Sequence, residues 1–86
     1  MNPMISEWIE RLLSNNGAQS ISELTRDMIL DEIREIKGSI KNEKLWALGA
    51  PTEASAALHI QNIEAFKEYM AYLETLPQML NLLVDK

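Results

Sequence analysis

Two helix-length segments of this chain carry apolar stripes that match each other when the segments are laid antiparallel. Within each stripe the apolar residues recur at alternating spacings of three and four, which is typical of a helix with one buried face. The first stripe comprises Ile29, Ile33, Ile36 and Ile40, and the second comprises Ile63, Phe66, Met70 and Leu73. Folding the chain at its Gly-Ala-Pro segment, residues 49–51, sets Ile40 opposite Ile63 and Ile36 opposite Phe66. The sequence therefore predicts an antiparallel helical hairpin with helices at about 25–48 and 53–76.

Capping residues and helix breakers define the expected ends of the long helices and of two shorter ones. Thr52 is a good N-cap directly after the glycine and proline of the predicted turn. Asn2, followed by a proline, begins a short N-terminal helix, and Pro77 separates a short C-terminal helix from the hairpin. We expect one all-α domain over residues 1–86. Gly38 lies inside the first long helix, where glycine costs about 1 kcal/mol relative to alanine, so continuity of the helix at this point stays open.

Composition limits the classes of function open to the chain. It has no cysteine, and therefore neither a disulfide framework nor a thiolate metal site. No stretch approaches the roughly 18 apolar residues of a membrane span, and no secretory signal is visible, so we expect a cytoplasmic protein that binds no membrane. A net charge of −5 argues against direct binding of nucleic acid, because phosphates are held by clusters of lysine and arginine.

Three lysines share one face of the first long helix: Lys37, Lys41 and Lys44. They occupy its C-terminal half, whereas acidic residues such as Asp27 and Asp31 occupy the N-terminal half. This distribution is the one that the helix dipole favours. We therefore interpret the lysines as a complement to the dipole rather than as a surface for nucleic acid.

The turn end of the predicted hairpin carries apolar residues for which the chain offers little cover. Both short helices attach at the opposite, open end, because one precedes the first long helix and the other follows the second. The residues left near the turn are Leu45, Trp46, Leu48, Leu58 and Ile60. Exposed apolar patches mark interaction sites, and tryptophan is enriched at binding hot spots, so we expect Leu45, Trp46 and Leu48 to contact a partner. The alternative is that the N-terminal helix reaches far enough to cover them.

The two short helices hold more apolar residues than one flank of the hairpin is expected to bury. A second copy of the chain, related by a two-fold axis, would cover the surplus, and two-fold dimers are the commonest small assembly. The expected interface residues are Trp8, Leu12, Met79, Leu80 and Leu83, with Trp46 as the next candidate. The sequence therefore predicts a homodimer or a higher homo-oligomer.

Beyond the apolar pairs, the hairpin register sets Glu43 opposite His59, the only histidine of the chain. A buried polar pair can fix the register of two paired helices, and this is our preferred interpretation. The same pair is also a candidate contact for a partner or ligand, half of a metal site, or an acid–base pair. A metal would need further ligands, for which Glu53 and Asn62 are the conceivable candidates, and no catalytic motif stands at a recognisable spacing. We therefore expect no cofactor, no bound metal and no enzyme activity.

Three segments of the chain resemble small helical-hairpin proteins found in phages and prophages of Gram-positive bacteria. They are residues 42–49 (Asn-Glu-Lys-Leu-Trp-Ala-Leu-Gly), 59–64 (His-Ile-Gln-Asn-Ile-Glu) and 69–74 (Tyr-Met-Ala-Tyr-Leu-Glu). The resemblance implies a helical hairpin and a phage-borne protein that acts in the host cytoplasm. It implies no particular activity.

These observations favour a non-enzymatic protein that binds or regulates another protein and forms homo-oligomers. A first alternative is an acidic inhibitor of the anti-defence type, which occupies the nucleic-acid-binding surface of a host protein. A second alternative is a small metal- or ligand-binding helical protein that uses Glu43 and His59. The first alternative predicts binding that weakens strongly with salt, because charge mimicry is screened by ions.

Overall fold

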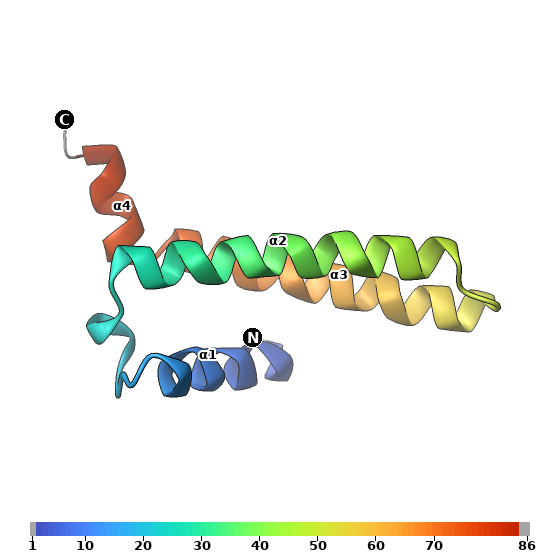
Figure 1. Cartoon of the computed structure of the whole chain (residues 1–86), viewed down its shortest axis with the longest axis horizontal. Coiled ribbons are helices and arrows are strands. Elements are labelled where there is room, and N and C mark those ends of the chain that lie inside the picture. The colour runs from blue at the N-terminus through green and yellow to red at the C-terminus, as the bar shows by residue number, and fades with distance from the viewer. Residues whose placement is uncertain (1, 85–86) are drawn as a thin grey trace.

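The computed structural model describes residues 2–84, with side chains up to residue 80. In chain order the elements are α1 (Pro3–Asn15), the 3-10 turn η1 (Ile21–Glu23), α2 (Arg26–Leu48), α3 (Glu53–Glu74) and α4 (Pro77–Val84). Among the described residues there is no strand, so the predicted all-α fold is confirmed. The long helices α2 and α3 form the predicted hairpin, and α1 and α4 lie near its open end (Figure 1). We call the half of the hairpin beside α1 the proximal half and the half that ends in the turn the distal half.

Side chains satisfy backbone donors at the start of three helices. The first N–H groups of a helix have no partner within it, and an N-cap oxygen can accept from one of them. The Asn2 side chain accepts from the N–H of Met4 at 2.9 Å. Thr25 accepts from the N–H of Met28 at 3.2 Å, and Thr52 accepts from Ser55 at 3.1 Å. The helix starts that the sequence predicts at Asn2 and Thr52 are thus confirmed, and α2 begins directly after Thr25, in agreement with the predicted start at about residue 25.

Helix α2 runs without interruption through Gly38. A Cβ atom placed on this glycine meets nothing within 4 Å, so no neighbouring element requires the missing side chain. The helix is therefore continuous at this position, and the glycine lies on its outer surface.

The core contains the predicted stripe of α2 and a shifted version of the stripe of α3. All four isoleucines of α2 are buried, each at most 7% exposed, and Ile63 and Leu73 of α3 are buried at 9% and 1% exposure. Phe66 and Met70 are only partly buried, whereas Ala65 and Tyr69 are buried to 3% and 1% exposure. The shift arises because α1 packs on the side of α3 that carries Tyr69, which rotates the buried face toward that side.

Helix α1 adds a third layer to the proximal half. The ring of Trp8 stacks on Phe66 with centroids 4.7 Å apart, and it also lies 5.4 Å from the ring of Tyr69. Ile5 and Leu12 of α1 are buried in the same core. Helix α1 therefore covers this side of the proximal half.

Candidate protein-binding surface at the hairpin turn

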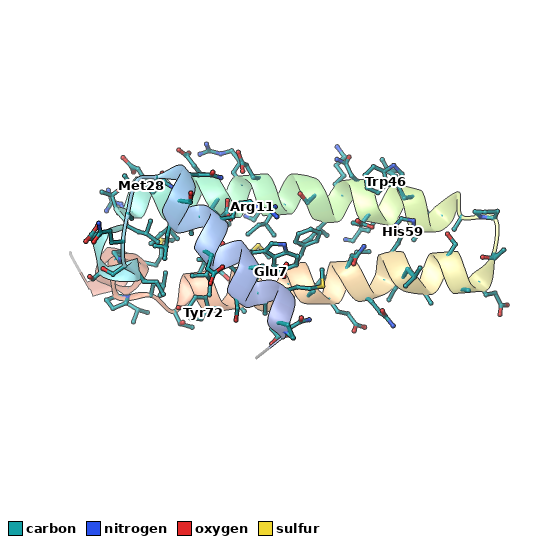
Figure 2. All side chains as sticks on the ribbon, turned by 90° about the horizontal axis from the view of Figure 1, so that it is seen from below. Glu7, Arg11, Met28, Trp46, His59 and Tyr72 are labelled. Carbon is teal, nitrogen blue, oxygen red and sulfur yellow. The ribbon has the colours of Figure 1, made fainter. Side chains whose placement is uncertain are left out.

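Helix α1 is too short to cover the whole hairpin. Its 13 residues span about 20 Å, whereas the 23 residues of α2 span about 35 Å at 1.5 Å per residue. Since α1 lies beside the proximal half, about 15 Å of the hairpin extends beyond it. Figure 2, which views the molecule from the side of α1, shows Trp46 and His59 in this uncovered distal region.

The distal half exposes large apolar side chains. Their exposed fractions are 58% for Leu45, 56% for Trp46, 86% for Leu48, 61% for Leu58 and 50% for Ile60. The prediction that these residues lack cover is confirmed, and the alternative in which the N-terminal helix reaches them is wrong because α1 is too short. Elsewhere among the described side chains, only Met4 and Leu80 are large, apolar and exposed.

Two of these exposed apolar residues, Trp46 and Leu58, lie on one face of the hairpin. Trp46 lies seven residues after Ser39, which shares a hollow with Trp8 of α1, and seven residues is two helical turns. Leu58 lies four residues before Asn62 and eleven before Tyr69, on the corresponding side of α3. Trp46 and Leu58 therefore continue the face that α1 covers in the proximal half. We call these two residues the distal patch.

Glu43 is the polar anchor beneath the distal patch. Its side chain is only 11% exposed, and its Oε2 atom accepts a hydrogen bond from Nδ1 of His59 at 2.6 Å. Its other oxygen accepts from the side-chain amide of Asn62 at 3.3 Å. The predicted pairing of Glu43 with His59 is confirmed, and Asn62 is a partner that sequence reasoning considered only as a metal ligand.

His59 also touches the distal patch. Its ring lies 5.9 Å from the ring of Trp46, centroid to centroid, with the two planes tilted by 51°. The Glu43 hydrogen bond orients the imidazole, and the imidazole in turn supports one face of the indole. The exposed tryptophan thus borders a partly buried polar pair.

The cluster around Glu43 resembles a structural pair more than a metal centre. Both carboxylate oxygens already accept hydrogen bonds from protein donors. Among the described side chains, no group of three or more histidine, cysteine, aspartate or glutamate residues could hold a metal ion. This geometry favours the register-fixing interpretation over the metal-binding one. Within residues 2–84, none of the helices has the length and apolar character of a membrane span.

The structure places the other expected interface residues mostly inside the chain. Leu12 is 4% exposed and belongs to the core, Trp8 is stacked on Phe66, and Met79 packs partly buried against the core. Leu80 is 45% exposed, and the side chain of Leu83 lies outside the described residues. The premise that α1 and α4 carry surplus apolar surface therefore fails for Leu12 and holds only weakly for Trp8 and Met79, because the intramolecular core takes up these side chains.

A glutamine that sequence reasoning overlooked explains how α4 is attached. The side-chain amide of Gln78 donates to the backbone carbonyls of Ile21 at 2.8 Å and Leu24 at 2.9 Å. These carbonyls stand at the two ends of the turn η1, so one amide fixes α4 against the connection between α1 and α2. Nothing in the sequence around Gln78 distinguishes it from a glutamine in contact with solvent.

The distal patch, supported by His59 and Glu43, is the strongest candidate for a functional surface. It is exposed, apolar, centred on a tryptophan and positioned by the two packed helices α2 and α3. These residues are identified from the sequence pattern and the geometry, since no protein-family model, no curated protein and no solved structure matches the chain.

Proposed function

We propose that this chain is a non-enzymatic protein-interaction domain that binds through the distal patch. The observation that carries the proposal is the 56% exposure of Trp46, on a face that is covered by α1 elsewhere in the molecule. Tryptophan contributes a large apolar area at a low cost in side-chain entropy, and it is enriched among the residues that dominate binding energy. The Glu43–His59 pair preorganises this residue, which reduces the cost of ordering it on binding.

A second copy of the chain is the partner we propose first. A two-fold axis beside the distal patch would pair Trp46 and Leu58 of one copy with the same residues of the other. The bare face measures about 15 Å along the hairpin and about 20 Å across two helices, or about 300 Å². Stable pairs usually bury about 800 Å² on each partner, so we expect a reversible dimer with a dissociation constant in the micromolar range or weaker.

Sedimentation equilibrium tests this assembly. We expect the unmodified chain to shift from monomer toward dimer between about 10 and 500 μM, which brackets a micromolar dissociation constant. The variant Trp46→Ser/Leu58→Ser should remain monomeric over the same range. Leu80→Ser is the matched control, because it removes an exposed leucine of similar accessibility from α4. A variant that dimerises as well as the unmodified chain would exclude the distal patch as the interface.

The fluorescence of Trp46 separates self-association from binding to a different protein. In a Trp8→Phe chain Trp46 is the only tryptophan, and acrylamide should quench it less as the protein concentration rises. Full quenching at every concentration, together with a monomeric mass, would contradict the homo-oligomer and direct the search to a different protein partner. The phage-borne origin and action in a host cytoplasm remain part of this proposal, supported by the sequence resemblance.

An acidic hollow supports a second candidate function. Asp31, Glu32 and Glu35 border a hollow of about 240 Å³ between α1 and α2. This surface fits an inhibitor that occupies a nucleic-acid-binding site by presenting carboxylates where phosphates would lie. We expect a target captured by the chain to be released by duplex DNA and by 0.5 M salt, and Glu35→Gln to weaken capture. Capture that is insensitive to both DNA and salt would exclude the inhibitor.

A further inference from the structure

Four lysines meet in a groove on the side of the hairpin away from α1. The groove has a volume of about 350 Å³ and is lined by Lys37, Ile40, Lys41, Lys44, Lys67 and Met70. No residue of α1 borders it. The three lysines of α2 share a face in the sequence, and the hairpin brings Lys67 of α3 to join them. Half of the eight basic residues of an acidic chain are thus gathered at one place.

Among the described side chains, no carboxylate forms an ion pair with any of these four ammonium groups. Among the described residues the ion pairs are those of Arg34 with Asp31 and of His59 with Glu43, and neither involves a lysine of the groove. The groove lining itself contains no acidic residue. The like charges therefore repel one another across the groove and favour the arrival of an anionic group.

The helix dipole accounts for only one of the four lysines. Its effect is confined to about the last turn of a helix, and α2 ends at Leu48 while α3 ends at Glu74. Lys44 lies close to such an end, but Lys37, Lys41 and Lys67 each lie seven or more residues before the end of their helix. Complementing the helix dipole therefore does not explain why the other three lysines lie together in this groove.

The shape of the groove fits a helix. It runs between two antiparallel helices, and α1 occupies the corresponding position on the other side of the same pair. Its floor is apolar, because Ile40 and Met70 lie between the lysines. Helical spacing continues this face with Leu48, four residues after Lys44, and with Ile60, seven residues before Lys67; they are 86% and 50% exposed. A matching ligand is apolar along its centre and negatively charged along its edges.

We propose that this lysine groove binds an acidic amphipathic helix of a partner protein. A second copy is a poor occupant, because a two-fold axis here would set eight lysines against one another. Duplex nucleic acid makes no use of the apolar floor, and the net charge of −5 opposes its approach. The groove and the distal patch lie on different faces of the hairpin. An experiment can therefore contradict the proposal for one surface without affecting the proposal for the other.

Binding of a synthetic helical peptide of about 18 residues tests the proposal. The peptide carries leucines at positions i, i+3, i+4 and i+7 with glutamates on both flanks, and a second peptide has glutamine in place of every glutamate. The variant Lys41→Glu/Lys67→Glu reverses two charges of the groove. The control Arg11→Glu/Arg26→Glu makes the same change in net charge outside it. Fluorescence anisotropy of the labelled peptides measures binding, and circular dichroism verifies that each variant is folded.

We expect the acidic peptide to bind the full chain with a micromolar dissociation constant. Reversal of the two groove charges should weaken binding by about tenfold or more, 0.5 M salt should weaken it as well, and the control should change it by less than about threefold. The glutamine peptide should bind at least about tenfold more weakly. Trp46→Ser/Leu58→Ser should leave peptide binding unchanged, which separates this groove from the distal patch.

Several outcomes would overturn the proposal. They are the absence of peptide binding at 1 mM, equal losses in the groove and control variants, and tighter lysine-dependent binding of a DNA duplex or of anionic lipid vesicles. Self-association that disappears in the lysine variant would assign the groove to a second copy instead. If the charge reversal unfolds the chain, Lys41→Gln/Lys67→Gln tests the same expectation, since it removes the positive charges without introducing negative ones.

Discussion

Glu43 selects the register of the hairpin. The isoleucines on α2 are interchangeable partners for the apolar stripe of α3, so a shift of one heptad would still pair apolar residues with each other. The same shift would separate Glu43 from both His59 and Asn62 and leave a nearly buried carboxylate without its two donors. A buried charge without partners is strongly unfavourable. The polar cluster therefore excludes alternative registers that the apolar residues tolerate.

A double-mutant cycle measures this coupling. His59→Leu leaves the Glu43 carboxylate with only the 3.3 Å hydrogen bond from Asn62, and we expect a loss of about 1–3 kcal/mol in the free energy of unfolding. Glu43→Leu/His59→Leu removes the charge together with its partner, so its loss should be smaller than the sum of the two single losses. Urea denaturation provides the three values. Strict additivity would show that the two side chains do not depend on each other.

Tyr69 is the residue whose ionisation the fold changes most clearly. Burial raises the pKa of the Tyr69 phenol well above its usual range, and the hydrogen bond that it donates to Glu32 at 2.8 Å raises the pKa further. In the unfolded chain the phenol ionises near pH 10. The stabilisation from the neutral phenol is therefore fully present below pH 10 and is lost as the pH rises above 10 toward the folded value.

Comparison of the unmodified chain with Tyr69→Phe isolates this effect. At pH 7 the substitution should lower the free energy of unfolding by about 1–2 kcal/mol through loss of the bond to Glu32. Above pH 10 this difference should shrink by about 1.4 kcal/mol per pH unit, because only the unmodified chain loses the contribution of the phenol. Urea denaturation between pH 7 and 11 gives both numbers. A difference that stays constant with pH would contradict the assignment.

At the scale of the helices, Gly38 is a weak point of α2 that no contact explains. Ala at this position adds a methyl group into open space and restricts the unfolded chain. We expect Gly38→Ala to raise the free energy of unfolding by about 0.5–1 kcal/mol, measured from the urea midpoint. Gly17→Ala is the contrasting variant, because Gly17 has a φ of 64° after α1 and should lose about 1 kcal/mol or more. Destabilisation by Gly38→Ala would contradict the open surroundings of this glycine.

The elements that sequence reasoning predicted are those with a local signal. Stripes of period 3.6, together with caps and breakers, identify α2, α3 and the turn, and the register then follows and predicts the pairing of Glu43 with His59. The angle at which α1 crosses the hairpin has no such signal. Burial of Tyr69 depends on that angle, so it was missed. The attachment of α4 by Gln78 and the approach of Lys67 to the lysines of α2 also depend on contacts between residues far apart in the chain.

At the scale of the whole molecule, the two halves of the hairpin differ in cover. The proximal half has α1 as a third layer, and the fully buried side chains of Ile5, Ile29, Tyr69 and Leu73 lie there. The distal half consists of two helices with exposed apolar residues on both faces. Local stability follows the density of buried apolar contacts. The distal patch therefore occupies the part of the fold that contributes least to its stability.

Amide hydrogen exchange tests this gradient and links it to function. We expect amides of residues 43–47 in α2 to exchange about tenfold to a hundredfold faster than those of residues 29–36 at low protein concentration, because opening the distal half exposes fewer buried groups. If the distal patch mediates dimerisation, exchange at 43–47 should slow as the concentration rises, while exchange at 29–36 should not change. In Trp46→Ser/Leu58→Ser the concentration dependence should vanish and the gradient itself should remain. Uniform protection along α2 would refute the gradient, and slowing confined to the proximal half would move the interface to α1 or α4.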